Sequence, residues 1–401
     1  MQNRRSRAVW FVAIAIAFFF ILDPFRLFQQ DNVPRMRVNR DVERQMTEFL
    51  TASPEAAEYV VGLFRNHDLV LIGETGYVRE QLEFLAELIP ALDEAGIRHL
   101  GFQYANRDDQ ERIDALITAP SFDERLANEI MFDHMVIMGY EEHRDVFRAA
   151  WEVNQGKSVG EEPFRIIGIS RPPDYTYIRS EGDADDPAVL QEAFARGVPD
   201  AVMARTILER IVEAGHKGVA YMRNEHAYTR FVQDQYTIRM EERGFPGEQR
   251  AGNQLADRLG DRVKAVLFHT PLQDTRSRFG FGYPVGGIVD NAKKTIPEGR
   301  RPGFTVAQAP YAEAPISSDV ITEHVEEDLQ FQQFTDGYLL INRLADYRAV
   351  TPIPGFVTAE NLERARAEFP GPDPGEVTVE DMNEFISGMA ASMAQIFEKF
   401  Q

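Results

Sequence analysis

Acidic and basic side chains come shortly after several apolar stretches of this sequence. Glu74 follows LVLIG directly, His226 comes four residues after GVAYM, and His269 ends RVKAVLFH. Carboxylates and imidazoles are common general acids and bases, so these residues are candidates for proton-transfer chemistry, with Glu74 as a base or as the group that orients an imidazole. For Glu74 the alternative is a carboxylate that caps a helix. For the two histidines it is a structural role.

Other polar residues follow the same apolar stretches. Arg107, Arg171 and Arg223 have the chemistry to clamp a carboxylate or a phosphate, although internal ion pairs are the alternative in so acidic a chain. The residues that we assign to substrate binding share this position after an apolar stretch, and they are Tyr77, Gln103, Arg107, Arg223 and His269.

No metal site is predicted. His134 and His143 are nine residues apart, which is not the i, i+4 spacing of two zinc ligands on one helix, so we interpret them as helix-surface or packing residues. The chain has no cysteine, which excludes disulfides, thiolate metal ligands and cysteine nucleophiles.

The elements that must position these side chains alternate along the chain. Short apolar stretches with strand character are separated by segments with apolar residues at helical spacing. This pattern is typical of an α/β fold with a mainly parallel sheet, helices on both faces, and further helices at the N- and C-terminal ends. The carboxyl ends of parallel strands gather at one edge, where ligands usually bind. We expect strands at 69–73, 99–105, 164–169, 218–222, 262–269 and 338–341.

The first thirty residues have the features of an export segment. Arg4, Arg5 and Arg7 precede an apolar stretch at 8–22, which is shorter than the roughly 20 residues of a typical membrane-spanning helix. The pattern predicts an export signal or an N-terminal anchor in the inner membrane, with the rest of the chain in the cell envelope, outside the cytoplasm. The alternative is a buried core helix.

Composition limits the partners of the protein. The 401 residues include 43 Lys and Arg against 64 Asp and Glu, a formal net charge of −21. Such a field repels phosphate backbones, so nucleic acid is excluded as a partner and a small molecule is expected. We divide the chain into the export segment or anchor at 1–30, one α/β domain at 31–350, and a C-terminal helical extension at 351–401 packed on that domain.

The order of several motifs resembles a known superfamily, that of the erythromycin-esterase-like and ChaN-like haem-uptake domains, which are related to the Tiki proteases. The resemblance spans roughly 60–345, and it implies an α/β fold. The motifs are LVLIGETGYVREQLEFL at 69–85, HLGFQYA at 99–105, WEVN at 151–154, RIIGIS at 165–170, GVAYMRNEHA at 218–227 and DGYLLINRL at 336–344.

The departures from that superfamily fall at its catalytic positions. Glu74 and His226 match it, but Gly76 or Tyr77 replaces the histidine that follows Gly-Glu, and Gln103 replaces a catalytic glutamate. An amide cannot accept a proton at neutral pH, and acid–base groups are worth about 10²–10⁴ in rate. The resemblance therefore predicts a degenerate site.

The sequence is compatible with two main functions. A third, a scaffolding role, is supported only by the N-terminal segment and the net charge. The first is a small-molecule binding protein. The ChaN-like branch implies haem as its ligand, and Tyr77 with His226 is then the candidate pair of iron ligands. The second is a hydrolase of an ester-type bond, in which Glu74 positions or deprotonates, His226 is the acid–base group, and Arg107 or Arg223 holds an anion. The cofactor and the oligomeric state are left open.

Overall fold

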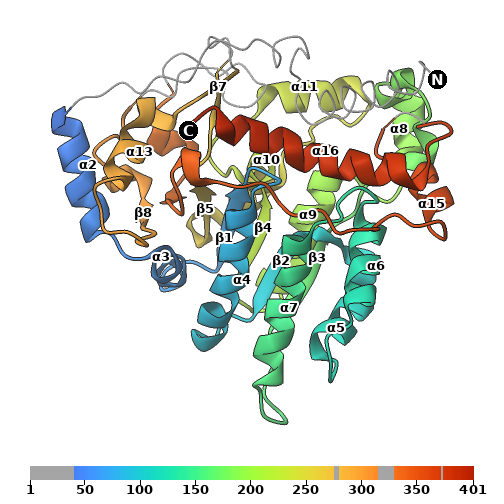
Figure 1. Cartoon of the computed structure of the whole chain (residues 1–401), viewed down its shortest axis with the longest axis horizontal. Helices are drawn as coiled ribbons and strands as arrows, with labels where there is room; N and C mark the ends of the chain where they lie inside the picture. Colours follow the sequence, from blue (N-terminus) through green and yellow to red (C-terminus); the bar gives the residue numbers. More distant parts are fainter. Residues whose placement is uncertain (1–39, 275–279, 315–328, 372–373) are drawn as a thin grey trace.

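A mixed seven-stranded sheet forms the centre of the described residues (Figure 1). The computed structural model describes residues 40–274, 280–314, 329–371 and 374–401. The strand order is β3-β2-β4-β1-β5-β9-β8, with β8 antiparallel to β9 and the other pairs parallel. The strands are β1 (Leu69–Glu74), β2 (His99–Asn106), β3 (Arg165–Ser170), β4 (Gly218–Arg223), β5 (Val263–Phe268), β8 (Gly303–Thr305) and β9 (Gly337–Leu339).

The central strands are apolar along their length because both faces of the sheet are covered. Successive residues of β1 enter different cores: Val70 and Ile72 pack in one, and Leu69 and Leu71 in the other. The first core is completed by helices α3 (Ala56–Leu63), α4 (Arg79–Glu94), α5 (Gln110–Thr118), α6 (Glu124–His134), α7 (Glu141–Gln155), α15 (Leu362–Ala367) and α16 (Val379–Glu398). The second is completed by α2 (Arg40–Ala52), α9 (Pro199–Ile207), α10 (Asn224–Ala227), α12 (Ala251–Leu259), α13 (Ile288–Lys293) and α14 (Phe331–Phe334).

Two more helices and a strand pair pack around these layers, and the strand pair places Phe281 in the first core and Leu272 against the second. Helices α8 (Pro187–Ala193) and α11 (Asp234–Glu242) belong to small apolar clusters of their own. Strands β6 (Leu272–Asp274) and β7 (Gly280–Gly282) form a separate antiparallel pair. The long helix α16, red in Figure 1, contributes Met382, Phe385 and Met389 to the first core, so the C-terminal region is packed on the α/β body.

The predicted fold class is confirmed, and the differences are local. The strand expected at 164–169 starts one residue later, and the one expected at 338–341 is β9, which ends at Leu339. Between β3 and β4, the chain forms the separate helices α8 and α9, and a π-helical turn at Leu208–Val212 follows α9. Pro199 explains the division, since proline cannot continue a helix but suits the first turn of a new one.

The inner-membrane anchor that was one of the two expectations for the N-terminal segment requires a correction. Among the described residues, no helix combines the length and the apolar character needed to cross a membrane. Residues 1–30, on which the predicted inner-membrane anchor depended, lie outside the described residues. The anchor therefore has no support, whereas the location outside the cytoplasm stays a prediction.

Candidate functional site

Glu74, the last residue of β1, is completely buried at the carboxyl edge of the sheet. Its Oε1 accepts a hydrogen bond from the Tyr104 hydroxyl, and its Oε2 accepts one from the backbone N–H of Gly76 at 2.5 Å. Burial raises the pKa of Glu74, while the Arg223 guanidinium and these hydrogen bonds oppose the rise. Both carboxylate oxygens thus have protein partners.

Arg223, at the end of the neighbouring strand β4, connects Glu74 with Gln103, another predicted site residue, and with Glu225, which was not predicted. Its Nε donates to Glu225 Oε1 at 2.7 Å, and its backbone N–H donates to Gln103 Oε1 at 2.8 Å. Burial raises the pKa of Glu225, but the positive charges of Arg223 and His226 outweigh it and bring that pKa to about 2. Glu74, Gln103 and Arg223 therefore meet at one place, as the strand ends predict.

His226 follows Glu225 in the short helix α10, and Asp200 of helix α9 orients its ring. Its Nδ1 lies 2.7 Å from Oδ1 of Asp200, which also accepts the backbone N–H of Ala251 at 2.8 Å. The other oxygen, Oδ2, pairs with Arg250 Nη1 at 3.2 Å. Burial raises the pKa of Asp200, but His226 and Arg250 outweigh it, so that this pKa lies below its ordinary value.

An ionised Asp200 accepts a proton-bearing Nδ1, which leaves the lone pair of His226 on Nε2. Within the described part of the chain, that nitrogen has no hydrogen-bond partner, and the side chain is 13% exposed. An imidazole held by a carboxylate through one nitrogen, with the other nitrogen accessible, is the usual arrangement of a general base.

An aromatic layer covers Glu74 on the side of the first core. Tyr77 is buried in the left-handed conformation (φ 58°), and its hydroxyl donates to Met138 Sδ at 3.7 Å. The His143 ring lies 4.1 Å from the Tyr104 ring, between centroids. Burial lowers the pKa of His143 to about 3 and that of His134 to about 4. Tyr77 is therefore enclosed by side chains and does not face an open cleft.

The two histidines of this layer are packing residues, which was one of the two interpretations of the sequence. Helix α7 buries His143, Val146, Phe147 and Ala150, and this i, i+3, i+4, i+7 spacing identifies its inward face. His143 has both ring nitrogens buried without a hydrogen bond in the described structure. This spacing is visible in the sequence, where it indicates a buried helix face that includes His143.

His269 and Arg107 also follow strands, but their contacts are separate from those of Glu74, Arg223 and His226. His269 is fully buried, with Nε2 2.8 Å from Asp290 Oδ2 and Nδ1 2.9 Å from the Tyr338 hydroxyl. A cavity of about 500 Å³ beside Asp290 includes neither Glu74 nor His226 in its lining. Arg107 lies 3.6 Å from Glu209, and burial and three nearby arginines lower its pKa. Neither residue contacts Glu74, Arg223 or His226 in any hydrogen bond or ion pair of the described structure.

Comparisons with known proteins give a weak likeness in fold. No model of a known family matches the sequence, and no curated protein matches it. Similar solved structures include a protein from Bacillus cereus, with 12% identity over 79% of this chain and 99% of that chain and a TM-score of 0.49. A mutant of the erythromycin esterase EreC in its open conformation has 13% identity, 70% and 92% coverage and a TM-score of 0.44. ChaN of Campylobacter jejuni, described with cofacially bound haem, has 10% identity, 56% and 89% coverage and a TM-score of 0.34.

Both groups named by the sequence resemblance are thus among the structural neighbours. Their TM-scores lie below 0.5, so the activities of these neighbours are not transferred to this chain.

Proposed function

We propose that the carboxyl edge of the sheet binds a small molecule and hydrolyses an ester-type bond in it, with His226 as the general acid–base group. The observation that carries this proposal is the contact of 2.7 Å between His226 Nδ1 and the buried Asp200. It fixes the tautomer and the direction of the ring while Nε2 stays accessible. In the superfamily that the motifs resemble, the matching histidine has the same position after a strand.

The reaction requires one proton to move in each direction. Nε2 of His226 takes a proton from water as the water oxygen bonds to the ester carbonyl carbon. The resulting imidazolium is stabilised by Asp200, and it returns the proton to the alkoxide as the carbon–oxygen bond breaks. Asp200 is therefore a positioning residue, and the acid and the alcohol are the products.

Glu74 supports this site rather than donating or accepting the proton in our proposal. Its two oxygens are engaged by Tyr104 and Gly76, and it is fully buried. It orients the loop after β1 and contributes the negative charge beside which Arg223 is held.

A second function, ligand binding without turnover, is favoured by Gln103. Its Oε1 accepts the Arg223 N–H, so this side chain serves the backbone at a position where the resembled superfamily has a catalytic glutamate. We do not extend the second function to haem held by Tyr77 and His226. Tyr77 is 3% exposed and donates to Met138, so it would have to leave the core to bind iron.

Turnover separates the two functions. The purified chain is offered a panel of p-nitrophenyl esters and lactones, beside His226→Ala and a control, His67→Ala, which removes an imidazole that contacts the Asp261 carbonyl. We expect turnover by the wild type and by His67→Ala, and a loss of about 10²–10⁴ in His226→Ala. Equal turnover in all three proteins would refute the proposal, and no turnover by the wild type would leave the binding function.

A further inference from the structure

Three side chains with metal-binding groups meet at the opposite edge of the sheet, where the strands begin. His99 is the first residue of β2, which lies between β3 and β4 and pairs with Arg165 and Gly218. Glu162 comes three residues before Arg165, and His216 comes two residues before Gly218. The segments that enter β3 and β4 therefore bring Glu162 and His216 to either side of His99.

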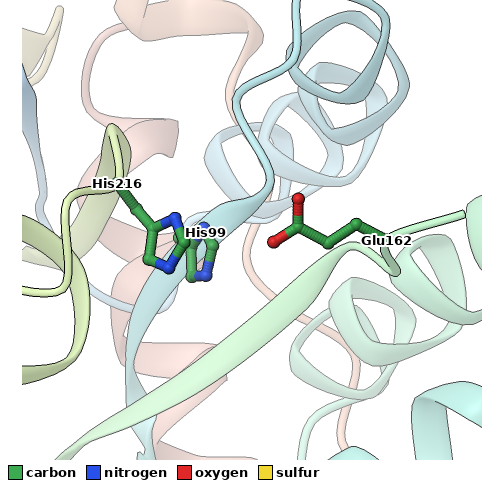
Figure 2. Close-up of side chains that lie close together, drawn as sticks. All are labelled: His99, Glu162 and His216. Atoms are coloured by element: carbon green, nitrogen blue, oxygen red, sulfur yellow. The ribbon is translucent and has the colours of Figure 1, made fainter.

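The donor atoms of this group converge. One ligand atom from each of His99, Glu162 and His216 lies within 4.8 Å of the other two. Figure 2 shows the two imidazoles lying against each other, with the Glu162 carboxylate directed toward His99. The ring centroids are 4.0 Å apart, and the ring planes differ by 18°.

The imidazole nitrogens of this group are not used by the fold. Within the described residues, neither His99 nor His216 makes a hydrogen bond through its ring. Glu162 has one ion-pair partner there, Arg98 at 3.5 Å, and Arg98 also pairs with Asp93 at 3.1 Å. Because Arg98 is also paired with Asp93, Glu162 can move away from Arg98 without leaving that guanidinium unpaired.

We propose that His99, His216 and Glu162 bind a divalent first-row transition ion, best suited to Zn²⁺. Two imidazoles and one carboxylate are an established donor set for zinc, with water as the fourth ligand of a tetrahedral site. The ion ties together the segments that enter β2, β3 and β4. It is independent of the hydrolytic site, which lies at the other edge of the sheet.

Binding requires a small adjustment that the structure permits. Ligand atoms around tetrahedral zinc are about 3.3 Å apart at bond lengths of about 2.0–2.2 Å, so the three donors must move closer and the stacked rings must tilt apart. His99 is 4% exposed and held in a strand, so it is the fixed ligand. Glu162, with 51% of its side chain exposed, and the half-buried His216 lie before their strands and supply the movement.

Titration of the full chain with zinc chloride tests the proposal. The protein is prepared without a polyhistidine tag and stripped with EDTA, and heat is recorded for the wild type, His216→Ala and Glu162→Gln. Two matched controls are Glu161→Gln, which changes the adjacent carboxylate, and His226→Ala at the other edge. We expect one zinc ion per chain, with Kd raised at least about 10–100-fold in His216→Ala and Glu162→Gln and unchanged in both controls.

Cobalt provides a second readout that does not depend on affinity. Co²⁺ at this site should give the visible absorption of a four-coordinate ion in the wild type, and the band should be lost in His216→Ala. The thermal midpoint of the wild type should rise with added zinc, because the ion binds the folded chain. Binding that is absent from the wild type, that persists equally in His216→Ala and Glu162→Gln, or that His226→Ala removes would overturn the proposal.

Discussion

The two edges of the central sheet use charged and ionisable side chains in different ways. At the carboxyl edge, Glu74 and Glu225 have partners within the protein, and the carboxylate of Asp200 is likewise engaged. At the opposite edge, the rings of His99 and His216 face each other without a hydrogen bond in the described residues. Residue types alone do not distinguish these edges. The groups that remain for a ligand are those that the fold has not engaged, and at the carboxyl edge these include Nε2 of His226.

The largest expected effect concerns Asp200. Asp200→Asn removes the charge that stabilises the imidazolium and weakens the hold on the ring, so ester turnover should fall about 10²–10⁴-fold. The kcat and KM values of the most reactive ester measure this, with circular dichroism to establish that the variant is folded. If only KM changed, Asp200 would not orient a catalytic group.

Arg223 should matter most for stability. Arg223→Ala leaves Glu74 and Glu225 buried without their guanidinium, and such a loss costs about 3–5 kcal/mol of unfolding free energy. Urea unfolding measures it. The control is Arg125→Ala, whose side chain is 76% exposed and pairs with Glu129, so that it should cost less than about 1 kcal/mol. Equal losses would mean that the carboxyl edge is not held by this ion pair.

Acid should weaken the aromatic layer over Glu74. Burial sets the folded pKa of His143 at about 3, against an ordinary value of 6.5. The unfolded chain therefore takes up the proton first, and the stability that His143 contributes is full above about pH 6.5 and falls as the pH is lowered towards 3.

Between pH 7 and pH 5 the expected loss from this group is about 2 kcal/mol. Urea unfolding at both pH values checks it, with His143→Phe as the comparison. Phenylalanine keeps a ring of similar size and has no group to protonate. A variant with the same pH dependence as the wild type would contradict a neutral, buried His143.

The smallest effect is expected at the other edge when no metal is present. In EDTA, Glu162→Gln should change the unfolding free energy by less than about 0.5 kcal/mol, since its only ion pair among the described residues is exposed and 3.5 Å long. Glu161→Gln should behave alike. A large loss in Glu162→Gln alone would assign that carboxylate a structural role and so weaken the contrast between the edges.

Much of the fold could be predicted from the sequence because its central strands are buried on both faces. Such strands are continuous apolar stretches, and the polar residues at or just after their carboxyl ends mark that edge of the sheet, which is how Glu74, Gln103, Arg223 and His226 were predicted as site residues. The membrane anchor was expected from the apolar residues 8–22, and the described structure gives it no support.

The partners of these residues could not be predicted in the same way. Asp200 lies 26 residues before His226, near the start of α9, and nothing in its local sequence indicates that contact. Glu162 and His216 precede strands, so a search of strand ends passes over them. Their convergence depends on β2 lying between β3 and β4, an order that the apolar pattern does not specify.

A double-mutant cycle on His226 and Asp200 tests the central claim most directly. Ester turnover is measured for the wild type, His226→Ala, Asp200→Asn and the double variant. If Asp200 acts through the imidazole, the double variant should be no slower than His226→Ala, because residues that act as one unit are not additive. Losses that multiply in the double variant would show that the two residues act separately, and the carboxyl edge would then lack the acid–base pair proposed for it.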